Sequence, residues 1–396
     1  MASPNPPNPP VLILGGWENS LSVARNLARK HIPVRLSADA SCPALRSRFC
    51  KARYVIPSNE PADSYWGHLL LGSDSAELRG SVLLACGDNA VEFVAKNRAQ
   101  LAPMYILDDS VPAVQLAMLD KQRTLELAHA AGCGIPQYWK LDTLADLEPI
   151  HRAVTFPVMI KPIDTFLSRR LLGKNFFIVH SSQELDEWAS RLLSRGLRIM
   201  ICEIIPGPDR EVQSSYYTYI DGQGRQLFRF TKRVLRRDPP FGGQACLHQT
   251  QWLPETAEVG ERFLRGIGFR GFGNVEFKRD PRDGQLKVIE CNPRFTAAHE
   301  LLERCGLNAA FLIYCQLTGR PLPMANSYRE NVFLWYPVQD LKAQIKGRNG
   351  LSTKQWLSSA LHWNTAFPYF ELDDPWPSAA LALDNIRHEI RKKRLS

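Results

Sequence analysis

The hydrophobic pattern of the chain begins with a short apolar run at residues 11–14, which ends in two glycines. A helix-like segment follows at residues 20–30, and further short apolar runs come at residues 33–36 and 81–85. Buried strands that alternate with helices are typical of a parallel α/β unit. The turn Gly15-Gly16-Trp17 lacks the complete glycine fingerprint of a dinucleotide site, so a ligand site and a plain strand-to-helix turn stay equally open.

The pattern changes at Asp120, where the apolar spacing predicts a helix that ends at a stretch with glycines and a proline. We place the first domain boundary just before this helix. Alternating runs at residues 212–220 and 226–234 predict an antiparallel hairpin. Helical spacing returns late in the chain, at residues 352–361 and 377–392.

A second hairpin carries the strongest chemical signal. Two strand-like runs flank the polar turn at residues 280–284, and folding the segment at its middle places Glu276 opposite Glu290. Because side chains alternate along a strand, Glu290, Asn292 and Arg294 share one face with Glu276. Two carboxylates held together repel unless a cation lies between them, and carboxylate and carboxamide oxygens suit Mg²⁺. The alternative is an exposed hairpin whose charges face water, although apolar neighbours indicate one dry face: Val275, Phe277, Val288 and Ile289.

Two further segments are candidates for nucleotide contacts. Lys161 ends a wholly apolar run, where a buried ammonium needs an anion such as phosphate, unless the lysine reaches solvent at a strand edge. The buried strand at residues 198–205 breaks at a Pro-Gly turn, which exposes backbone groups to a planar base, with Glu203 and Asp209 as acceptors. An ordinary interdomain turn explains the same residues equally well.

Two other basic residues have weaker local support. Arg233 precedes the glycine-containing loop at residues 239–243, where a basic side chain can clamp a phosphate or a carboxylate. A solvated basic loop is the alternative. Lys121, taken alone, is most simply a solvated helix residue.

With 396 residues, 44% of them hydrophobic and 22% charged, the chain has the composition of a globular protein with two or three domains. No apolar run approaches the roughly 20 residues that a bilayer span needs. The Pro/Asn-rich residues 1–10 predict a disordered tail that lacks the features of a signal peptide. Nine scattered cysteines without a CxxC pair indicate reduced, buried thiols in a cytoplasmic protein. The diffuse net charge of +9 does not distinguish nucleic acid, an acidic membrane and a phosphate-rich small substrate as partners.

Five motifs, in this order, resemble those of the ATP-grasp superfamily of carboxylate–amine ligases, in particular its D-aspartate-ligase-like and amino-acid-ligase members. They are DKQRT at Asp120, FPVMIKP at Phe156, EIIPGPD at Glu203, FGNVEFKRD at Phe272 and VIECNPRF at Val288. The resemblance covers residues 11–322 and continues more loosely beyond them. It implies an α/β (α+β) protein with an ATP-grasp fold of two lobes with antiparallel sheets, preceded by a Rossmann-like N-terminal domain.

The resemblance also implies a domain division. It places a Rossmann-like domain at residues 11–115 after the tail, and the ATP-grasp domain at residues 116–325. The small lobe then spans about 121–205 and the large lobe about 206–325. Residues 326–396 are expected to form a helical accessory region.

By the same resemblance, site residues fall into three groups. ATP is expected to contact Lys121, Lys161, Glu203, Ile204, Ile205 and Asp209, with Lys174 as a candidate in a loop that lacks the usual glycine-rich phosphate flap. Two Mg²⁺ ions, for which Mn²⁺ can substitute, are expected on Glu276, Glu290 and Asn292. The expected catalytic residues are Lys161, Arg233 and Arg294, of which Arg294 steadies an acyl-phosphate or its tetrahedral successor.

The implied reaction has two steps. A carboxylate attacks the γ-phosphate of ATP to give an acyl-phosphate, and an amine then displaces phosphate to form an amide. The expected partners are small carboxylate and amine substrates rather than nucleic acid or membrane, and a symmetric dimer is the default for a soluble enzyme. The alternatives are the same chemistry with another nucleophile or a carbohydrate acceptor, and a nucleotide-binding regulator without turnover.

Overall fold

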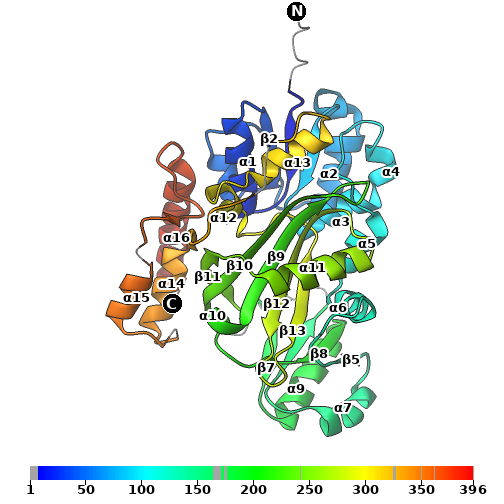
Figure 1. The fold of residues 1–396 in the computed structure, drawn as a ribbon, viewed down its shortest axis with the longest axis vertical. Helices are drawn as coiled ribbons and strands as arrows, with labels where there is room; N and C mark the ends of the chain where they lie inside the picture. Colours follow the sequence, from blue (N-terminus) through cyan, green and yellow to red (C-terminus); the bar gives the residue numbers. More distant parts are fainter. Residues whose placement is uncertain are drawn as a thin grey trace, which may run out of the picture.

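The computed structural model describes residues 8–163, 171–173, 176–240, 242–323, 327–348, 350–360 and 362–395. Most of the predicted N-terminal tail, the candidate Lys174 and the residue Phe241 lie outside these ranges. Within these ranges the strands form three sheets, and Figure 1 shows the long central sheet between the N-terminal sheet and the small sheet around β8.

The N-terminal sheet is parallel, as the alternation of apolar runs and helices predicts. Its four strands in sheet order are β3 (Cys50–Ile56), β2 (Val34–Asp39), β1 (Val11–Leu14) and β4 (Val82–Ala85). Its main helices are α1 (Glu18–Arg29), α2 (Ala62–Leu71), α3 (Asp88–Lys96), α4 (Arg98–Leu101) and α5 (Pro112–Leu119). Along β1, Val11 and Ile13 pack in one hydrophobic cluster, whereas Leu12 and Leu14 pack in another. Both faces of the sheet are therefore covered, which explains why its central strand is wholly apolar.

The small sheet is antiparallel and follows the predicted helix. That helix, α6 (Lys121–Ala130), begins where the Asp120 carboxylate accepts hydrogen bonds from the backbone of Gln122 (2.9 Å) and Arg123 (3.0 Å). The strands in sheet order are β5 (Tyr138–Leu141), β8 (Ile199–Glu203), β6 (Val158–Pro162) and β7 (Phe177–Val179). The helices α7 (Leu147–Ala153) and α9 (Ser182–Leu193) cover it, and their apolar residues complete a separate core.

The large sheet has seven strands and carries both predicted hairpins. In sheet order the strands are β13 (Leu286–Asn292), β12 (Gly271–Arg279), β9 (Gln213–Ile220), β10 (Gln226–Asp238), β11 (Gln244–Thr250), β14 (Phe333–Trp335) and β15 (Thr365–Ala366). The helix α10 (Asp209–Val212) precedes β9, and α11 (Pro254–Gly266) covers one face. The helices α12 (His299–Arg304) and α13 (Ala309–Leu317) follow β13 and pack with apolar residues of α1.

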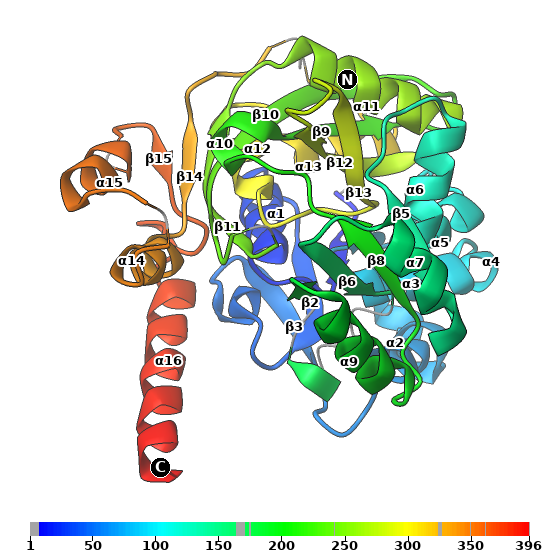
Figure 2. The same cartoon turned by 90° about the horizontal axis from the view of Figure 1, so that it is seen from below.

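The C-terminal region is only partly the helical accessory that the sequence predicts. The helices α15 (Thr353–Ala360) and α16 (Trp376–Leu395) match the predicted helical stretches, and α14 (Pro337–Ile345) precedes them. However, β14 pairs with β11 and β15 pairs with β14, so this region extends the large sheet. Figures 1 and 2 show α14, α15 and α16 on one side of the molecule, away from the small sheet.

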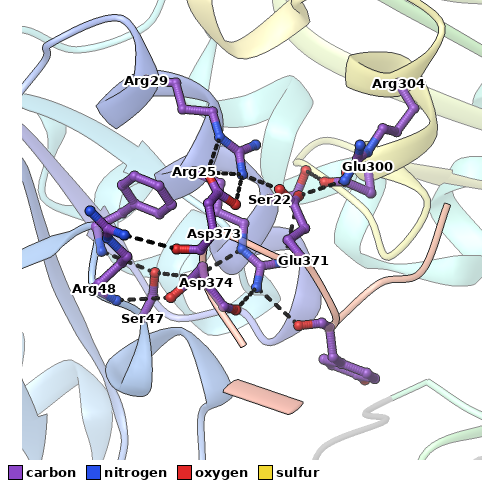
Figure 3. A network of polar contacts seen from close by, with 12 residues as sticks. Ser22, Arg25, Arg29, Ser47, Arg48, Glu300, Arg304, Glu371, Asp373 and Asp374 are labelled. Carbon is purple, nitrogen blue, oxygen red and sulfur yellow. Dashed lines mark hydrogen bonds and ion pairs between the residues drawn. The ribbon is translucent and has the colours of Figure 1, made fainter. Parts of the chain in front are cut away.

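The C-terminal chain also binds back onto the N-terminal helix α1 (Figure 3). Arg25 of α1 is 0% exposed and donates to the carboxylate of Asp374 (3.0 Å) and to the carbonyl of Tyr369 (2.9 Å). Arg304 of α12 pairs with Glu371 (3.0 Å). Residues 369–374, which we call the C-terminal strap, therefore connect the N-terminal domain to the helices behind the large sheet.

Two expectations from composition can be compared with the structure. All nine cysteines are buried and free of disulfides, as their apolar surroundings predict. Burial raises their thiol pKa values, for example to about 11 for Cys50 and about 12 for Cys246, which disfavours the reactive thiolate. None of the helices in the described ranges combines the length and the apolar character that crossing a bilayer requires.

Candidate functional site

The two acidic residues of the second hairpin lie opposite each other. In the register of β12 with β13, Glu276 faces Glu290 and Asn274 faces Asn292, so the predicted pairing is confirmed. The Asn292 amide donates to Glu290 Oε1 (3.2 Å), and the Gln213 amide donates to Glu276 Oε2 (3.1 Å). Acidic and amide groups thus gather on one face at the edge of the large sheet.

A β-bulge changes one detail of the predicted hairpin. After the Glu276–Glu290 pair the register shifts by one residue, so that Phe277 faces Val288 and not Ile289. Val288 and Cys291 therefore both join the core cluster with Phe277, whereas Ile289 lies outside it and is half-buried. The bulge keeps Glu290 on the polar face while the strand beyond it keeps its apolar residues in the core.

The opposed carboxylates favour a bound cation. Burial and the negative charge of Glu290 raise the pKa of Glu276, and the positive charges of Lys232 and Arg237 only partly offset this effect. Within the described ranges, no group of three or more His, Cys, Asp or Glu side chains is placed to hold a metal ion. A hard ion such as Mg²⁺ fits this site nonetheless, since it takes one or two carboxylates and completes its shell with water and phosphate oxygens.

Two lysines of the small-sheet region are the predicted phosphate ligands. Lys161 is on β6, opposite Met200 of β8, and Lys121 is the first residue of α6. The Lys121 ammonium donates to the Pro162 carbonyl (3.4 Å), and burial lowers its pKa while the charge of Glu290 opposes that shift. Lys121 is thus an electrostatic neighbour of both Glu290 and Lys161, although these residues come from different elements.

Arg294 connects the end of the hairpin to the N-terminal domain. Its guanidinium forms a fork with Asp88, the first residue of α3, with an Nη2–Oδ2 distance of 3.1 Å. The Asn19 side chain donates to the carbonyls of Cys86 and Phe295 (both 2.7 Å). These bonds hold the first turn of α1 beside the end of β4 and the residue that follows Arg294.

The glycine turn before α1 has a packing reason. Gly16 has a φ of +87°, and a Cβ atom there would lie 2.7 Å from the Cβ of Cys86. A larger residue would therefore clash with the end of β4. Gly16 therefore lies close to another part of the chain, at Cys86, which agrees with a plain strand-to-helix turn.

Comparisons with known proteins agree with this arrangement. No family model matches the chain. The D-aspartate ligase of Enterococcus faecium (strain Aus0004) is 24% identical over 319 residues, which are 76% of this chain and 74% of that one. Among solved structures, the L-amino acid ligase from Bacillus licheniformis has a TM-score of 0.59 at 18% identity, covering 83% of this chain and 79% of that one. The biotin carboxylase domain of the Hydrogenobacter thermophilus 2-oxoglutarate carboxylase, in complex with MgADP, ADP and bicarbonate, has a TM-score of 0.62 at 18% identity, covering 81% and 73%.

The chain has the ATP-grasp fold. The small antiparallel sheet and the large sheet are the two lobes of this fold, and the parallel sheet that precedes them is Rossmann-like. The acidic pair lies on the large lobe, and Lys121 and Lys161 come from the side of the small lobe.

One basic residue near the acidic pair was missed from the sequence. Lys232 on β10 lies opposite Ser215 of β9, which in turn lies opposite Glu276 of β12. Residues in such a row point to the same face, and the Lys232 ammonium, in a side chain only 2% exposed, donates to Ser215 Oγ (3.1 Å). Burial lowers its pKa to about 8. The alternation along residues 226–234 marked this position, but only the pairing of three strands connects it to Glu276.

Arg233, the expected catalytic residue, lies on the opposite face of the large sheet. Its Nε donates to Gln251 Oε1 (2.7 Å), and its side chain lines a cavity of about 140 Å³ with Thr256 and Arg279. The reason is strand periodicity, because neighbouring residues point to opposite faces and Lys232 occupies the face with the acidic pair.

The predicted adenine hinge connects the two lobes. At the end of β8, Glu203 accepts hydrogen bonds from the Gln137 backbone (2.8 Å) and from Arg282 in the β12–β13 turn (2.7 Å). Ile204 is half-buried, and Ile205 is buried at 3% exposure. The acidic group of the predicted hinge thus already has protein partners.

The predicted ribose acceptor is also paired within the protein. Asp209 pairs with Arg237 (2.8 Å) and lies 3.4 Å from the ammonium of Lys278, two residues beyond Glu276 on β12. Asp209 is thus held on the face of the large sheet that carries the acidic pair.

Proposed function

We propose that the protein is an ATP- and Mg²⁺-dependent ligase that activates a carboxylate as an acyl-phosphate and joins it to an amine. The observation that carries this proposal is the opposed pair of Glu276 and Glu290, with Lys121 close enough from the other lobe to sense its charge. Paired carboxylates and separate cations suit a triphosphate with its metal ion, because each phosphate oxygen meets a positive charge.

In this proposal, nucleotide and metal have separate sets of ligands. Lys121 and Lys161 bind the phosphates, and the hinge residues Glu203, Ile204 and Ile205 with Asp209 line the base and ribose, with Lys174 as a further proposed phosphate ligand. Glu276, Glu290 and Asn292 would hold Mg²⁺, which supplies positive charge against the transferred phosphoryl group.

The chain's own residues then have defined tasks. Lys232 stands two strands from Glu276, where its ammonium can meet the charge that develops on the γ-phosphoryl group. Arg294, oriented by Asp88, steadies the acyl-phosphate. Carbonyl carbon becomes electrophilic once phosphate is its leaving group, and the amine displaces that phosphate to form the amide. Closure of the two lobes would exclude water, which otherwise hydrolyses the acyl-phosphate.

The comparisons support an amine as the nucleophile. A D-aspartate ligase and an L-amino acid ligase are both similar to this chain over about three quarters of its length or more. An ATP-grasp enzyme with a different nucleophile would keep the same nucleotide site. A regulator without turnover would not need Arg294 beside the acidic pair.

The test is release of phosphate from ATP in the presence of Mg²⁺, screened across pooled amino acids and small carboxylic acids with product masses read in the same wells. The expected result is release that requires two added compounds and gives a mass equal to their sum less water. If the protein binds the nucleotide but no pool leads to phosphate release, the ligase proposal is contradicted and the regulator is favoured.

Lys232 predicts a pH dependence of nucleotide affinity. Its pKa of about 8 in the free protein means that it loses its charge above that pH, whereas bound phosphates stabilise the charged form. Affinity is therefore expected to be level below pH 8 and to fall by up to about tenfold per pH unit above it. Calorimetric titration with an ATP analogue from pH 7 to pH 9.5 measures this directly.

Two variants control this experiment. Lys232→Met should bind the analogue more weakly at pH 7, and its affinity should not show the fall above pH 8 that Lys232 causes. Lys232→Arg should keep its affinity across the range because its charge persists. The effect of pH on stability has the opposite sign, because Lys232 of the unfolded chain keeps its proton up to about pH 10.5. Between pH 8 and that value, the contribution of Lys232 to stability rises with pH. A Lys232→Met profile that parallels the wild type would contradict the assignment.

A further inference from the structure

A buried carboxylate lies at the edge of the N-terminal sheet where ligands of α/β proteins bind. Glu18 is the first residue of α1 and follows the turn after β1, at the carboxyl end of that parallel strand. A glutamate in a first helical turn is ordinarily exposed, where it gains from the helix dipole. Here Glu18 is only 8% exposed. Its burial therefore needs another explanation.

The partners of this carboxylate do not neutralise its charge. The Tyr369 hydroxyl donates to Glu18 Oε2 (3.2 Å), and the Tyr336 hydroxyl lies 3.4 Å from Oε1. Among the described residues, no Lys, Arg or His nitrogen makes an ion pair with Glu18. Burial accordingly raises the pKa of Glu18, and hydrogen bonds from its own backbone and from the two tyrosines, with the more distant charge of Arg294, offset this only in part.

One of the two tyrosines has a better acceptor elsewhere. A tyrosine hydroxyl has a single proton to donate. The Tyr336 hydroxyl is 3.0 Å from the carbonyl of Ala297, which is closer than Glu18 Oε1 at 3.4 Å. When that proton goes to Ala297, Oε1 loses the Tyr336 donor. A buried anion in this condition is costly unless a cation binds it.

The carboxylate is close to the proposed reaction centre. Ala297 follows Arg294 by three residues, and the neighbouring Asn19 side chain is bonded to the Phe295 carbonyl (2.7 Å). Arg294 is near enough for its charge to act on Glu18. A ligand group on Glu18 would thus lie beside the arginine that we assign to the acyl-phosphate.

We infer that Glu18 binds the ammonium group of an amino-acid substrate, with Tyr369 as the residue that positions its carboxylate. This inference rests on the proposed function, because it names the substrate class of the same site. Tyr369 belongs to the C-terminal strap, where Arg25 donates to its carbonyl (2.9 Å). Figure 3 shows Arg25 with Asp374 of the same strap. The C-terminal strap therefore completes the substrate subsite, in addition to connecting domains.

The test measures binding rather than turnover. The full chain, with Mg²⁺ and a non-hydrolysable ATP analogue, is titrated with D-aspartate and the twenty standard amino acids. The amino acid that binds best is then compared with its analogue that lacks the amino group, such as succinate for aspartate. The wild type is expected to prefer the amino acid by about 100-fold, as for a desolvated charge pair. Glu18→Gln should lose this preference while its affinity for the nucleotide analogue stays unchanged.

Control variants separate recognition from structure. Tyr369→Phe should reduce the preference partly, because it removes the donor to Oε2 but leaves the charge. Arg48→Met is the matched control, since its side chain touches the carbonyl of Asp373 in the same C-terminal strap but not Glu18. It should keep the full preference, and thermal unfolding of each variant verifies that it is folded.

The outcomes distinguish the subsite from the ligase proposal. Equal affinity of the wild type for both members of the pair, no binding by any amino acid, or a preference that survives in Glu18→Gln would each overturn the inference. If Glu18→Gln loses the preference but no pool of substrates releases phosphate, the subsite stands and the ligase proposal fails.

Discussion

Glu290→Gln is expected to lower ATP-dependent turnover by at least about 1,000-fold, because it removes one of the two opposed carboxylates that would hold Mg²⁺. Glu276 keeps its place in the register of the hairpin, but a single carboxylate offers the ion half the negative charge. Phosphate release under the conditions found in the substrate screen is the measurement.

The same substitution should not damage the fold. Two like charges opposite each other on neighbouring strands repel, so removing one of them relieves repulsion and lets the pKa of Glu276 fall toward its ordinary value. Thermal unfolding of Glu290→Gln should occur at the wild-type temperature or higher. Glu255→Gln is the matched control, because Glu255 pairs with Arg279 by the cavity on the other face. Full activity of Glu290→Gln at ordinary Mg²⁺ would refute the metal assignment.

Asp340→Ala is expected to destabilise the protein by about 3–5 kcal/mol, because it leaves a buried charge without its partner. Asp340 is 0% exposed and accepts bonds from Arg236 Nε (2.8 Å) and Nη2 (2.6 Å). It also accepts from the indole nitrogens of Trp335 (2.8 Å) and Trp356 (2.9 Å). The substitution would leave all of these donors without their acceptor. Denaturant unfolding of the full chain measures the effect.

A double variant gives the control for this prediction. Replacing both partners, in Arg236→Met with Asp340→Leu, removes the unpaired charge and should recover part of the lost stability. If Asp340→Ala unfolds within about 1 kcal/mol of the wild type, the cluster does not stabilise the C-terminal region as the contacts indicate.

The part of the site that could be predicted consists of residues whose relation is local in sequence. Glu276 and Glu290 belong to one hairpin, so the alternation of strand side chains and a short turn were enough to pair them. The bulge that displaces Ile289 could not be predicted in this way, since a single extra residue leaves the pattern of apolar letters nearly unchanged.

Relations between distant segments required the structure. Lys232 joins Glu276 only through β9, and the choice of Lys232 over Arg233 depends on the register of that third strand. Asp88 and Arg294 are 206 residues apart, and no local pattern connects them. The strands β14 and β15 have only three and two residues, which is too short for alternation to mark them.

The sequence by itself therefore determined the order of the elements, the parallel character of the N-terminal sheet, and two antiparallel hairpins of the large sheet, one of which carries the acidic pair. These follow from periodicity and turn chemistry, which act over a few residues. Only the tertiary structure decided which polar groups come together: Lys121 with Glu290, Arg294 with Asp88, and Tyr369 with Glu18. The physical reason is that burial and charge compensation belong to the packed chain, where one residue's partners come from any point along the sequence.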